Sequence, residues 1–391
     1  MKPKGRILME YSFPIKPRLS CPGPTTVPLD SALAGLHTEV YHRSPEFKEE
    51  VLKSRQLLQP FFGSTELPLL LSASGSGAME AAMQNLSCEG DKVLVINGGK
   101  FGDRWAKLSQ AYACDLVEMR LPWGHSVDMD ALEDILKKNK DIRAVFFQGN
   151  ETSTGVAYPT EKIAKLIREI CPDALVVVDA ISALVAHKIE MAAWDIDCLL
   201  SGSQKGFGVP PGLSFISLSD RAWSRISTRQ KFYFDLEKER KGQETGTTAW
   251  TPPVSLINTL NGSLERLSLL GVDTCVQYHQ DAAQICRHAI QAIGLKLFSQ
   301  KDHSQALTAI QLPASIDGVK FNQHVKNKYG ISFAGGQDEA KGKIVRVAHL
   351  GIFDVFDVLS NISALELALT EFGYSFDLGS GTKAAMTKIR T

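Results

Sequence analysis

The sequence lacks an excess of charge of either sign, and it lacks a long apolar run. Its 391 residues carry 43 Lys+Arg against 43 Asp+Glu, so the formal net charge is zero. Proteins that bind nucleic acid or anionic membranes need a basic excess or a basic block, so we expect neither partner here. A membrane span requires roughly 18 consecutive apolar residues, and no segment approaches that length.

Closely spaced cysteines are also missing. The seven cysteines are scattered, none forms a CxxC pair and their number is odd, which predicts reduced thiols and a cytoplasmic protein. The basic N-terminal stretch has no uninterrupted apolar segment, so we do not expect a signal peptide. A composition of 44% hydrophobic and 22% charged residues is that of a globular protein and excludes a disordered or coiled-coil chain.

Strand and helix patterns alternate from about residue 74. Short apolar runs predict strands at 93–96, 115–119, 144–147, 174–178, 198–200 and 213–218. Helical spacing of apolar residues predicts helices at 76–86, 101–113, 129–138 and 161–170. This alternation indicates βαβ units, and therefore an α/β fold with a mostly parallel sheet covered by helices on both faces.

The pattern changes after Thr251-Pro252-Pro253. Helices are predicted at 254–270, 272–293, 319–328 and 355–372, and strands at 307–312 and 344–348. These elements indicate a smaller C-terminal α+β unit. We therefore expect an N-terminal arm over 1–21, a large domain over 22–260 and a small domain over 261–391.

Five segments of the large domain carry functional side chains next to predicted strand ends or helix starts. In SASGSGAMEAA (72–82), Ser74, Gly75 and Ser76 open a helix, where free N–H groups and the helix dipole attract a phosphate. A loop with an N-cap serine explains the same residues. The dinucleotide fingerprint GxGxxG does not fit, because its third glycine falls on Glu80.

Two further loops follow buried strands. Phe101, in NGGKFGDRW (97–105), is placed on a loop where an aromatic ring stacks on a planar ligand, although it equally suits packing in the core. Thr152 belongs to QGNETSTGVAYP (148–159), a polar loop of the kind at which open α/β sheets bind ligands. A polar turn before the next helix is the alternative.

The fourth and fifth segments contain an acid and a base. Asp179 ends the most apolar strand, where a carboxylate is costly without a positive partner. Lys205 lies in SGSQKGFGVPPG (201–212), a glycine-rich loop in which a desolvated lysine can bond to a carbonyl ligand. Asp179 as a turn cap and Lys205 as a surface charge remain the structural alternatives.

The order of these residues predicts the ligand. A phosphate cup, an aromatic residue, a strand-end Asp and then a lysine are the parts needed to hold pyridoxal 5′-phosphate (PLP). Asp179 would keep the pyridine nitrogen protonated, and Lys205 would bond to the cofactor and move the α-proton of the substrate.

With these residues in this order, the sequence resembles the class V aminotransferases of PLP fold type I, and within them the alanine–glyoxylate/serine–pyruvate aminotransferase group. The resemblance spans nearly the whole chain and rests on the motifs PGPTTVP (22–28), HRSPEF (42–47), SGSGAMEAA (74–82), ETSTGV (151–156), VDAISAL (178–184), SGSQKGFGVPPG (201–212), TPPVSLI (251–257) and VRVAHLG (345–351).

The resemblance implies further roles. Gln204 would contact the phosphate and Thr152 would bond near the ring hydroxyl. Thr248 and Thr251 match a segment that reaches the cofactor of a partner subunit, which implies a homodimer with shared sites. Arg346 would bind the substrate carboxylate, and Gly23 would line the substrate pocket.

The sequence departs from this group at two places. Relatives often carry His-Gly where this chain has Gly149-Asn150, which bears on substrate preference. They often carry Tyr where this chain has Thr248, which bears on phosphate contacts.

The activity that this implies is transfer of an amino group from a small monocarboxylate amino acid, alanine or serine, to glyoxylate or pyruvate. No metal site is expected. One alternative is a class V lyase of the cysteine desulfurase type, which would need a nucleophilic cysteine on a mobile loop, whereas Cys275 and Cys286 lie in a predicted helix. Another is a non-catalytic family member that serves as an assembly subunit, which the intact Asp179 and Lys205 disfavour.

Overall fold

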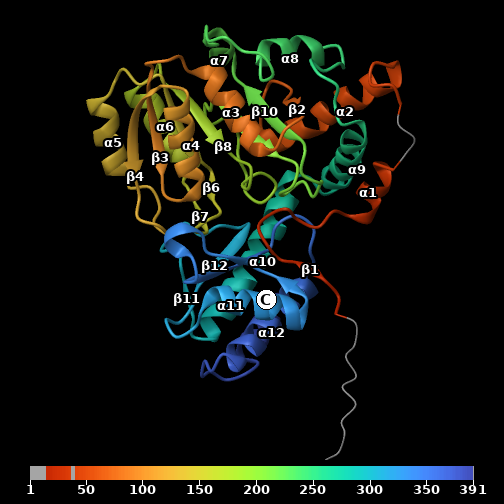
Figure 1. The fold of residues 1–391 in the computed structure, drawn as a ribbon, viewed down its shortest axis with the longest axis vertical. Helices are drawn as coiled ribbons and strands as arrows, with labels where there is room; N and C mark the ends of the chain where they lie inside the picture. The colour runs from red at the N-terminus through yellow and green to blue at the C-terminus, as the bar shows by residue number, and fades with distance from the viewer. Residues whose placement is uncertain (1–14, 37–39, 391) are drawn as a thin grey trace, which may run out of the picture.

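The computed structural model describes residues 15–36 and 40–390. The first fourteen residues of the predicted N-terminal arm lie outside the described residues. Two bodies of secondary structure are joined by the long helix α10 (Val272–Ala292), one built on the N-terminal sheet and one on a C-terminal sheet (Figure 1).

The N-terminal body is built on a seven-stranded sheet. Its order is β2 (Leu69–Leu71), β10 (Ser214–Leu218), β9 (Cys198–Gly202), β8 (Leu175–Asp179), β5 (Ala144–Gln148), β3 (Lys92–Asn97) and β4 (Asp115–Arg120). The five strands from β9 to β4 are parallel, and β10 runs antiparallel to both β2 and β9. The predicted mostly parallel sheet is confirmed.

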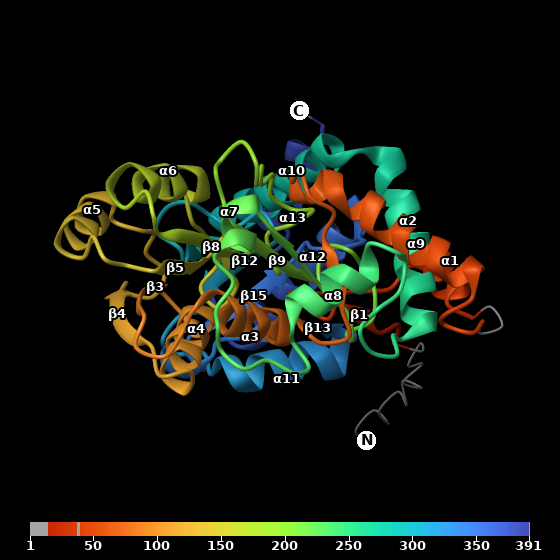
Figure 2. The ribbon, with the colours of Figure 1, turned by 90° about the horizontal axis from the view of Figure 1, so that it is seen from above.

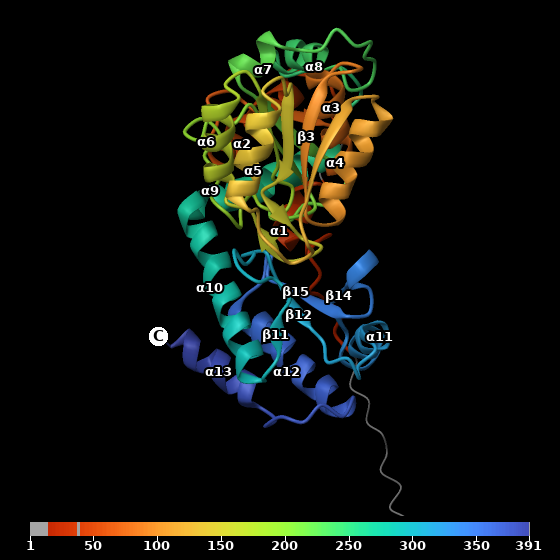
Figure 3. The ribbon, with the colours of Figure 1, turned by 90° about the vertical axis from the view of Figure 1, so that its left-hand side faces the viewer.

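Both faces of this sheet are buried under helices. Successive residues of a strand point to opposite faces, and accordingly Phe146 packs in one hydrophobic cluster while Phe147 packs in the other. The helices α3 (Gly75–Leu86) and α4 (Lys100–Ala111) cover one face, and α5 (Met129–Lys138) and α6 (Thr160–Ile170) cover the other (Figures 2 and 3). Continuous apolar strands such as Leu175–Asp179 are the expected consequence of burial on two sides.

Further helices flank this body. They are α1 (Leu29–Ala34), α2 (Pro45–Phe62), α7 (Asp220–Ser224), α8 (Leu236–Gln243) and α9 (Val254–Leu270). Ser44 caps the start of α2 by accepting a hydrogen bond from the Phe47 backbone N–H at 3.4 Å, and Gly63 ends the helix with φ +57°. The sequence pattern had not predicted α1, α2, α7 or α8.

The C-terminal body holds a four-stranded antiparallel sheet. Its order is β11 (Lys296–Leu297), β12 (Leu307–Gln311), β15 (Ile344–Ala348) and β14 (Ala334–Gly335), and the helices α11 (Gly318–Tyr329), α12 (Val355–Glu371) and α13 (Ser380–Ile389) pack with it; a short 3₁₀ turn, η1, covers Asp338–Ala340. The short strand β1 (Arg18–Leu19) pairs in parallel with β13 (Ile331–Ser332), so the N-terminal segment crosses this body before it enters the other.

The predicted boundary at residue 260 falls inside α9. Leu264 and Leu267 of this helix and Cys275 of α10 pack in the core of the N-terminal body, whereas residues from Ala282 onward pack in the C-terminal core. The division at residue 260 stays a prediction, and we propose that α10 itself carries the change from one body to the other. Within residues 15–36 and 40–390, no helix has both the length and the apolar composition needed to cross a membrane.

A buried polar cluster lies where the two bodies meet. His349 bonds through Nδ1 to the Gln305 carbonyl at 2.7 Å and through Nε2 to Thr308 Oγ1 at 3.0 Å. His187 Nε2 accepts from the Gln305 N–H at 3.0 Å, and His279 Nδ1 bonds to the Cys275 carbonyl at 2.7 Å. A carbonyl oxygen cannot donate, so the Nδ1 atoms of His279 and His349 must carry the hydrogen, and with their lowered pKa values both rings are neutral Nδ1–H tautomers.

Burial lowers the pKa of His187 and His349 to about 3 and that of His279 to about 4. The unfolded chain, with histidine pKa values near 6.5, therefore binds more protons than the folded chain below that pH.

We expect acid to destabilise the protein through this cluster. Stability should be lost as the pH falls below about 6.5, and each fully buried histidine should contribute about 1–2 kcal/mol of that loss by pH 5. The test is urea unfolding of wild type and His349→Gln at pH 7 and pH 5. Between pH 7 and pH 5, the free energy of unfolding should fall less in the variant than in wild type. An equal fall in the two proteins would contradict this account.

Candidate active site

The predicted acid and base meet at the carboxyl edge of the parallel sheet. Asp179 is the last residue of β8, and Lys205 follows the end of β9 by three residues. The register places Asp179 beside Gln148 of β5 on one side and Leu200 of β9 on the other. Ligands of open α/β sheets bind at this edge, because the loops after parallel strands gather there.

Lys205 has an environment that favours its neutral amine. Its Nζ donates to the Pro22 carbonyl. Burial, and to a smaller extent the nearby Arg346, lower its pKa to about 8, while the charge of Asp179 acts in the opposite direction. An amine that is partly deprotonated near neutral pH can act as a nucleophile and as a base.

Asp179 is a buried carboxylate, 5% exposed, with little to balance its charge. Its Oδ1 accepts one hydrogen bond from the Ile181 N–H at 2.8 Å. Burial, and to a smaller extent the charge of Glu151, raise its pKa to about 7, while the hydrogen bond from the Ile181 N–H and the charges of Arg104 and Lys205 act in the opposite direction. A positive ligand group beside Asp179 would restore its ionised form.

The predicted phosphate cup is the N-terminus of α3. Ser74 is its N-cap residue and makes no side-chain capping bond there. The backbone of Gly75 lies so near to the loop after β8 that a Cβ would stand 2.5 Å from Ile181 Cδ1. A Cβ at Gly202 would stand 3.0 Å from Gln204 Oε1, and this buried oxygen has no hydrogen-bond partner within residues 15–36 and 40–390. The cup is thus shaped by glycines and carries an unpaired polar atom.

Arg104 is a residue of the site that the sequence analysis missed. Its Nη1 donates to Ser76 Oγ at 2.8 Å, and its guanidinium carbon lies 5.0 Å from the centre of the Phe101 ring. Phe101 lies in the first turn of α4, as the predicted helix over 101–113 has it, and not on the loop before the helix. The three-residue spacing that puts Phe101 and Arg104 on one side of a helix was the available signal.

Arg346 lies in the middle of β15 and is 6% exposed. Its Nε and Nη2 donate to the Gly335 carbonyl at 3.0 and 2.7 Å, and its Nη1 donates to the Thr152 carbonyl at 2.7 Å. Burial lowers its pKa to about 10, and the charge of Glu151 opposes the shift. A guanidinium has five N–H groups, so one on Nη1 and one on Nη2 remain for a carboxylate.

The N-terminal segment closes the site over Lys205. The Thr25 N–H donates to the Gln204 carbonyl at 3.1 Å, and Thr25 Oγ1 donates to the Lys205 carbonyl at 2.8 Å. Gly23 has φ +114°, and a Cβ there would overlap the Lys205 amine. Cys21 lies next to this contact and donates to the Pro24 carbonyl at 3.6 Å.

Thr152 joins the site, whereas Thr248 and Thr251 lie elsewhere on this chain. Thr152 follows β6 (Asn150–Glu151), which forms a hairpin with β7 (Val156–Ala157). Thr248 Oγ1 donates to the Trp250 carbonyl at 2.5 Å, and the indole N–H of Trp250 donates to the Tyr233 carbonyl at 2.8 Å. The reach of Thr248 and Thr251 toward a partner subunit stays a prediction.

The cysteines of the predicted lyase alternative are buried. Cys275 and Cys286 are 3% and 1% exposed and lie in α10. Burial raises the pKa of Cys275, and it raises that of Cys286 to about 11. A desulfurase nucleophile must reach the substrate as a thiolate, which neither residue can do.

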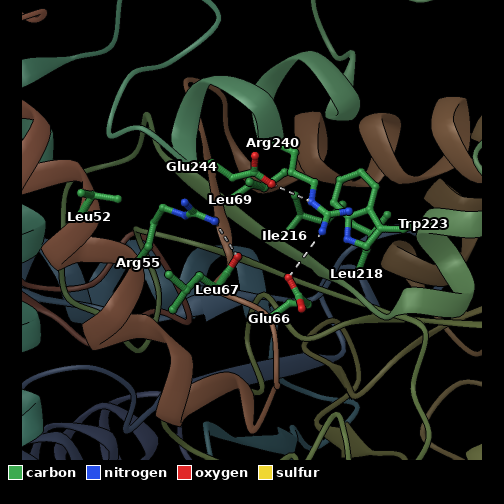
Figure 4. A pocket seen from close by; sticks show the side chains of 10 residues that line it. All are labelled: Leu52, Arg55, Glu66, Leu67, Leu69, Ile216, Leu218, Trp223, Arg240 and Glu244. Atoms are coloured by element: carbon green, nitrogen blue, oxygen red, sulfur yellow. Dashed lines mark hydrogen bonds and ion pairs between the residues drawn. The ribbon is translucent and has the colours of Figure 1, made fainter.

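A separate hollow of about 210 Å³ lies against the edge strand β2 (Figure 4). The guanidinium of Arg240 lies 4.6 Å over the Trp223 ring and is 3.2 Å from Glu244 and 3.8 Å from Glu66. Arg55 donates to backbone carbonyls of the same region. These charges are paired within the wall, so we assign no function to this hollow.

The contact between Gly23 and Lys205 can be tested with Gly23→Ala. A methyl group there forces the amine aside and also strains a left-handed backbone, so we expect a loss of about 1–3 kcal/mol in unfolding free energy. Gly90→Ala is the matched control, because Gly90 has φ +79° with nothing within 4 Å of a Cβ. Urea unfolding should show a smaller loss for the control.

The double variant Gly23→Ala/Lys205→Ala should recover the excess loss, since the overlapping amine is then absent. Equal losses for Gly23→Ala and Gly90→Ala would show that the Lys205 amine does not press on Gly23.

Comparisons with known proteins agree with this geometry. The model of the family "Aminotransferase class-V" matches residues 29–351. A protein of Synechococcus sp. (strain PCC 6716) named "Soluble hydrogenase, small subunit" is 37% identical over 96% of this chain and 99% of its own length. The L-aspartate–glyoxylate aminotransferase of Paracoccus denitrificans is 32% identical over 94% of this chain and 95% of its own.

A solved structure of an alanine–glyoxylate aminotransferase from Nostoc sp. superposes with a TM-score of 0.86 at 29% identity, covering 93% of this chain and 97% of the other. Like that enzyme, this chain has the architecture of PLP fold type I. With the family match over most of its length and the relatives that span nearly all of it, the chain belongs to the class V aminotransferases.

Proposed function

We propose that the protein is a PLP-dependent aminotransferase that moves the amino group of a small monocarboxylate amino acid, alanine or serine, to a 2-oxo acid such as glyoxylate or pyruvate. The observation that carries the proposal is the pair at the sheet edge. Lys205, with its lowered pKa, lies near Asp179, a buried carboxylate that lacks a strong positive partner.

The residues present fit PLP. Asp179 offers a buried negative charge for the pyridine nitrogen, and the Gly75–Gly202 approach leaves a cradle that a Cβ would fill. The N-terminus of α3 suits the phosphate, with Gln204 and Ser76 beside it. When bound, PLP supplies an electron-withdrawing ring that stabilises negative charge on the substrate carbon.

The chain's own residues then divide the work. Lys205 Nζ would hold the cofactor, and the same amine would take the proton from the substrate Cα. A cation beside Asp179 would favour its ionised form, and the carboxylate would in turn keep the pyridine nitrogen protonated. Arg346 orients the substrate through its two remaining N–H groups.

The charges around the site support a substrate with one carboxylate. Arg104 is engaged with Ser76 and the Phe101 ring, and Lys100 pairs with Asp338 at 2.8 Å. Lys188 pairs with Glu190 and Asp273. The two aminotransferases named above differ in the donor, which is aspartate in one name and alanine in the other, and both names give glyoxylate as the acceptor.

A homodimer is part of the proposal. Phe232 is 73% exposed and Tyr233 is 43% exposed, and both rings pack against Trp250 on the loop that carries Thr248 and Thr251. A partner subunit would cover these rings and receive the two threonines. All seven cysteines are free, which suits a reducing compartment such as the cytoplasm.

A second candidate is a non-catalytic subunit of a larger assembly, which the hydrogenase-subunit name of one relative favours. The two functions differ in turnover. A coupled screen of amino donors against glyoxylate and pyruvate should show activity with alanine or serine for the aminotransferase, and none for an assembly subunit.

Lys205→Ala should greatly slow this activity and abolish the covalent bond to the cofactor. Borohydride treatment of wild type should fix PLP on the Lys205 peptide, as seen by mass spectrometry. We expect the variant to lose about 10²–10⁴-fold in rate, since the positioned base is gone. Lys188→Ala is the control and should keep both properties. A fixed adduct on another lysine would overturn the assignment.

Arg346→Ala should raise the donor KM while cofactor binding barely changes. The substrate carboxylate would enter a dry site without its partner, which costs about 2–5 kcal/mol in kcat/KM. Arg346→Lys keeps the charge but loses the planar fork, so an intermediate defect is expected. An unaltered donor KM, or a clear preference for glutamate or aspartate, would contradict this account of the pocket.

A further inference from the structure

Glu151 is a fully buried carboxylate at the end of β6, 0% exposed. Four hydrogen bonds reach it. Oε1 accepts from the Ser153 hydroxyl at 2.5 Å and the Ser153 N–H at 3.1 Å, and Oε2 accepts from the N–H groups of Phe101 at 3.0 Å and Gly102 at 3.1 Å. Burial raises the pKa of Glu151, and these bonds oppose the shift.

Two of these bonds cap α4. The first N–H groups of a helix have no partner within the helix, and its dipole favours a negative charge there. The Lys100 N–H donates to Ser153 Oγ at 3.0 Å, so Glu151 and Ser153 together satisfy the first three N–H groups of this helix. The α4 N-terminus is therefore filled by the protein's own carboxylate and is not open to a ligand anion.

The capped helix carries two residues of the site. Phe101 lies in its first turn, and Arg104 bonds to Ser76 in the cup at the start of α3. Glu151 also packs directly on the loop before α4, because a Cβ at Gly99 would stand 2.6 Å from Glu151 Cδ. A shift of the Glu151 carboxylate would therefore displace the start of α4 and, with it, Phe101 and Arg104.

The residue after Glu151 contacts Arg346, the arginine proposed to bind the substrate carboxylate. The next residue, Thr152, accepts the Arg346 Nη1 hydrogen bond through its carbonyl at 2.7 Å. The segment from Glu151 to Ser153 therefore touches α4 of one body and β15 of the other. It is the short link between the ring-covering residue and the carboxylate-binding residue.

We propose that Glu151 is a positioning residue, whose carboxylate holds the first turn of α4 and the Thr152 carbonyl in the one arrangement that lets Phe101, Arg104 and Arg346 serve the same bound cofactor and substrate. This inference rests on the proposed function. Glu151 does not itself transfer a proton, because both of its oxygens are occupied by backbone and hydroxyl donors.

The test is Glu151→Gln, which keeps the size of the side chain. An amide NH₂ at the Oε2 position would lose both bonds to α4, and at the Oε1 position it would lose the bond from the Ser153 N–H; in either orientation the negative charge at the helix N-terminus is removed. Asp128→Asn is the matched control, because Asp128 caps α5 in the same way, accepting from Asp130 N at 3.1 Å and Ala131 N at 3.2 Å. Ser153→Ala, which removes only one branch of the cap, serves if Glu151→Gln does not fold.

Two measurements separate positioning from folding. The first is amide hydrogen exchange over residues 100–103 in cofactor-free protein, which should be faster in Glu151→Gln and unchanged in Asp128→Asn. The second is the rate of PLP release followed by its visible circular dichroism, which should rise about tenfold or more in Glu151→Gln. The donor KM should rise as well, because Thr152 orients Arg346.

Faster exchange in α4 with a wild-type rate of PLP release and a wild-type donor KM would overturn the inference, since Glu151 would then be only a helix cap. A wild-type protein that neither binds PLP nor transaminates would overturn the proposed function and, with it, this inference. The wild-type measurement thus distinguishes the two failures.

Discussion

Desolvation at the carboxyl edge of the sheet is the constraint on which the site depends. It acts on two groups of opposite charge and brings their pKa values closer together. The pKa of Lys205 falls to about 8 and that of Asp179 rises to about 7, because burial penalises the charged form of each. The amine becomes available as a base near neutral pH, and the carboxylate would be stabilised by a cation beside it.

The fold creates this desolvation by bringing distant segments over the strand ends. The N-terminal segment lies on Lys205 through Pro22 and Gly23, and β15 of the C-terminal body brings in Arg346. The pairing of β1 with β13 ties that N-terminal segment to the C-terminal body. A movement between the two bodies would therefore change two contacts of the site. One is the contact of the N-terminal segment with Lys205, and the other is the hydrogen bond between Arg346 and the Thr152 carbonyl.

The sequence predicted those features that depend on local pattern. The apolar run before Asp179 identified a strand buried on both faces, and the glycines around Lys205 identified a loop near a ligand. The helix α2 was missed although Ser44, Pro45 and Gly63 mark its ends, because its apolar residues alternate with many charged ones.

Arg104 and Glu151 were missed for a different reason. Their positions follow from contacts between segments far apart in the chain, such as Arg104 with Ser76 and Glu151 with the N-terminus of α4. Hydrophobic period and motif spacing carry no information about such contacts. A glutamate inside a polar loop reads as an exposed residue, and only the packing of the β6–β7 hairpin against α4 buries it.

The most direct measurement of the central claim is the half-reaction without an acceptor. Purified protein loaded with PLP is mixed with L-alanine alone or with L-serine alone, and the 2-oxo acid formed from each is quantified over time. A ping-pong aminotransferase should release about one equivalent of 2-oxo acid per chain from at least one of the two donors and then stop until glyoxylate is added. Absence of 2-oxo acid from both donors, or continuous release without any acceptor, would contradict the account.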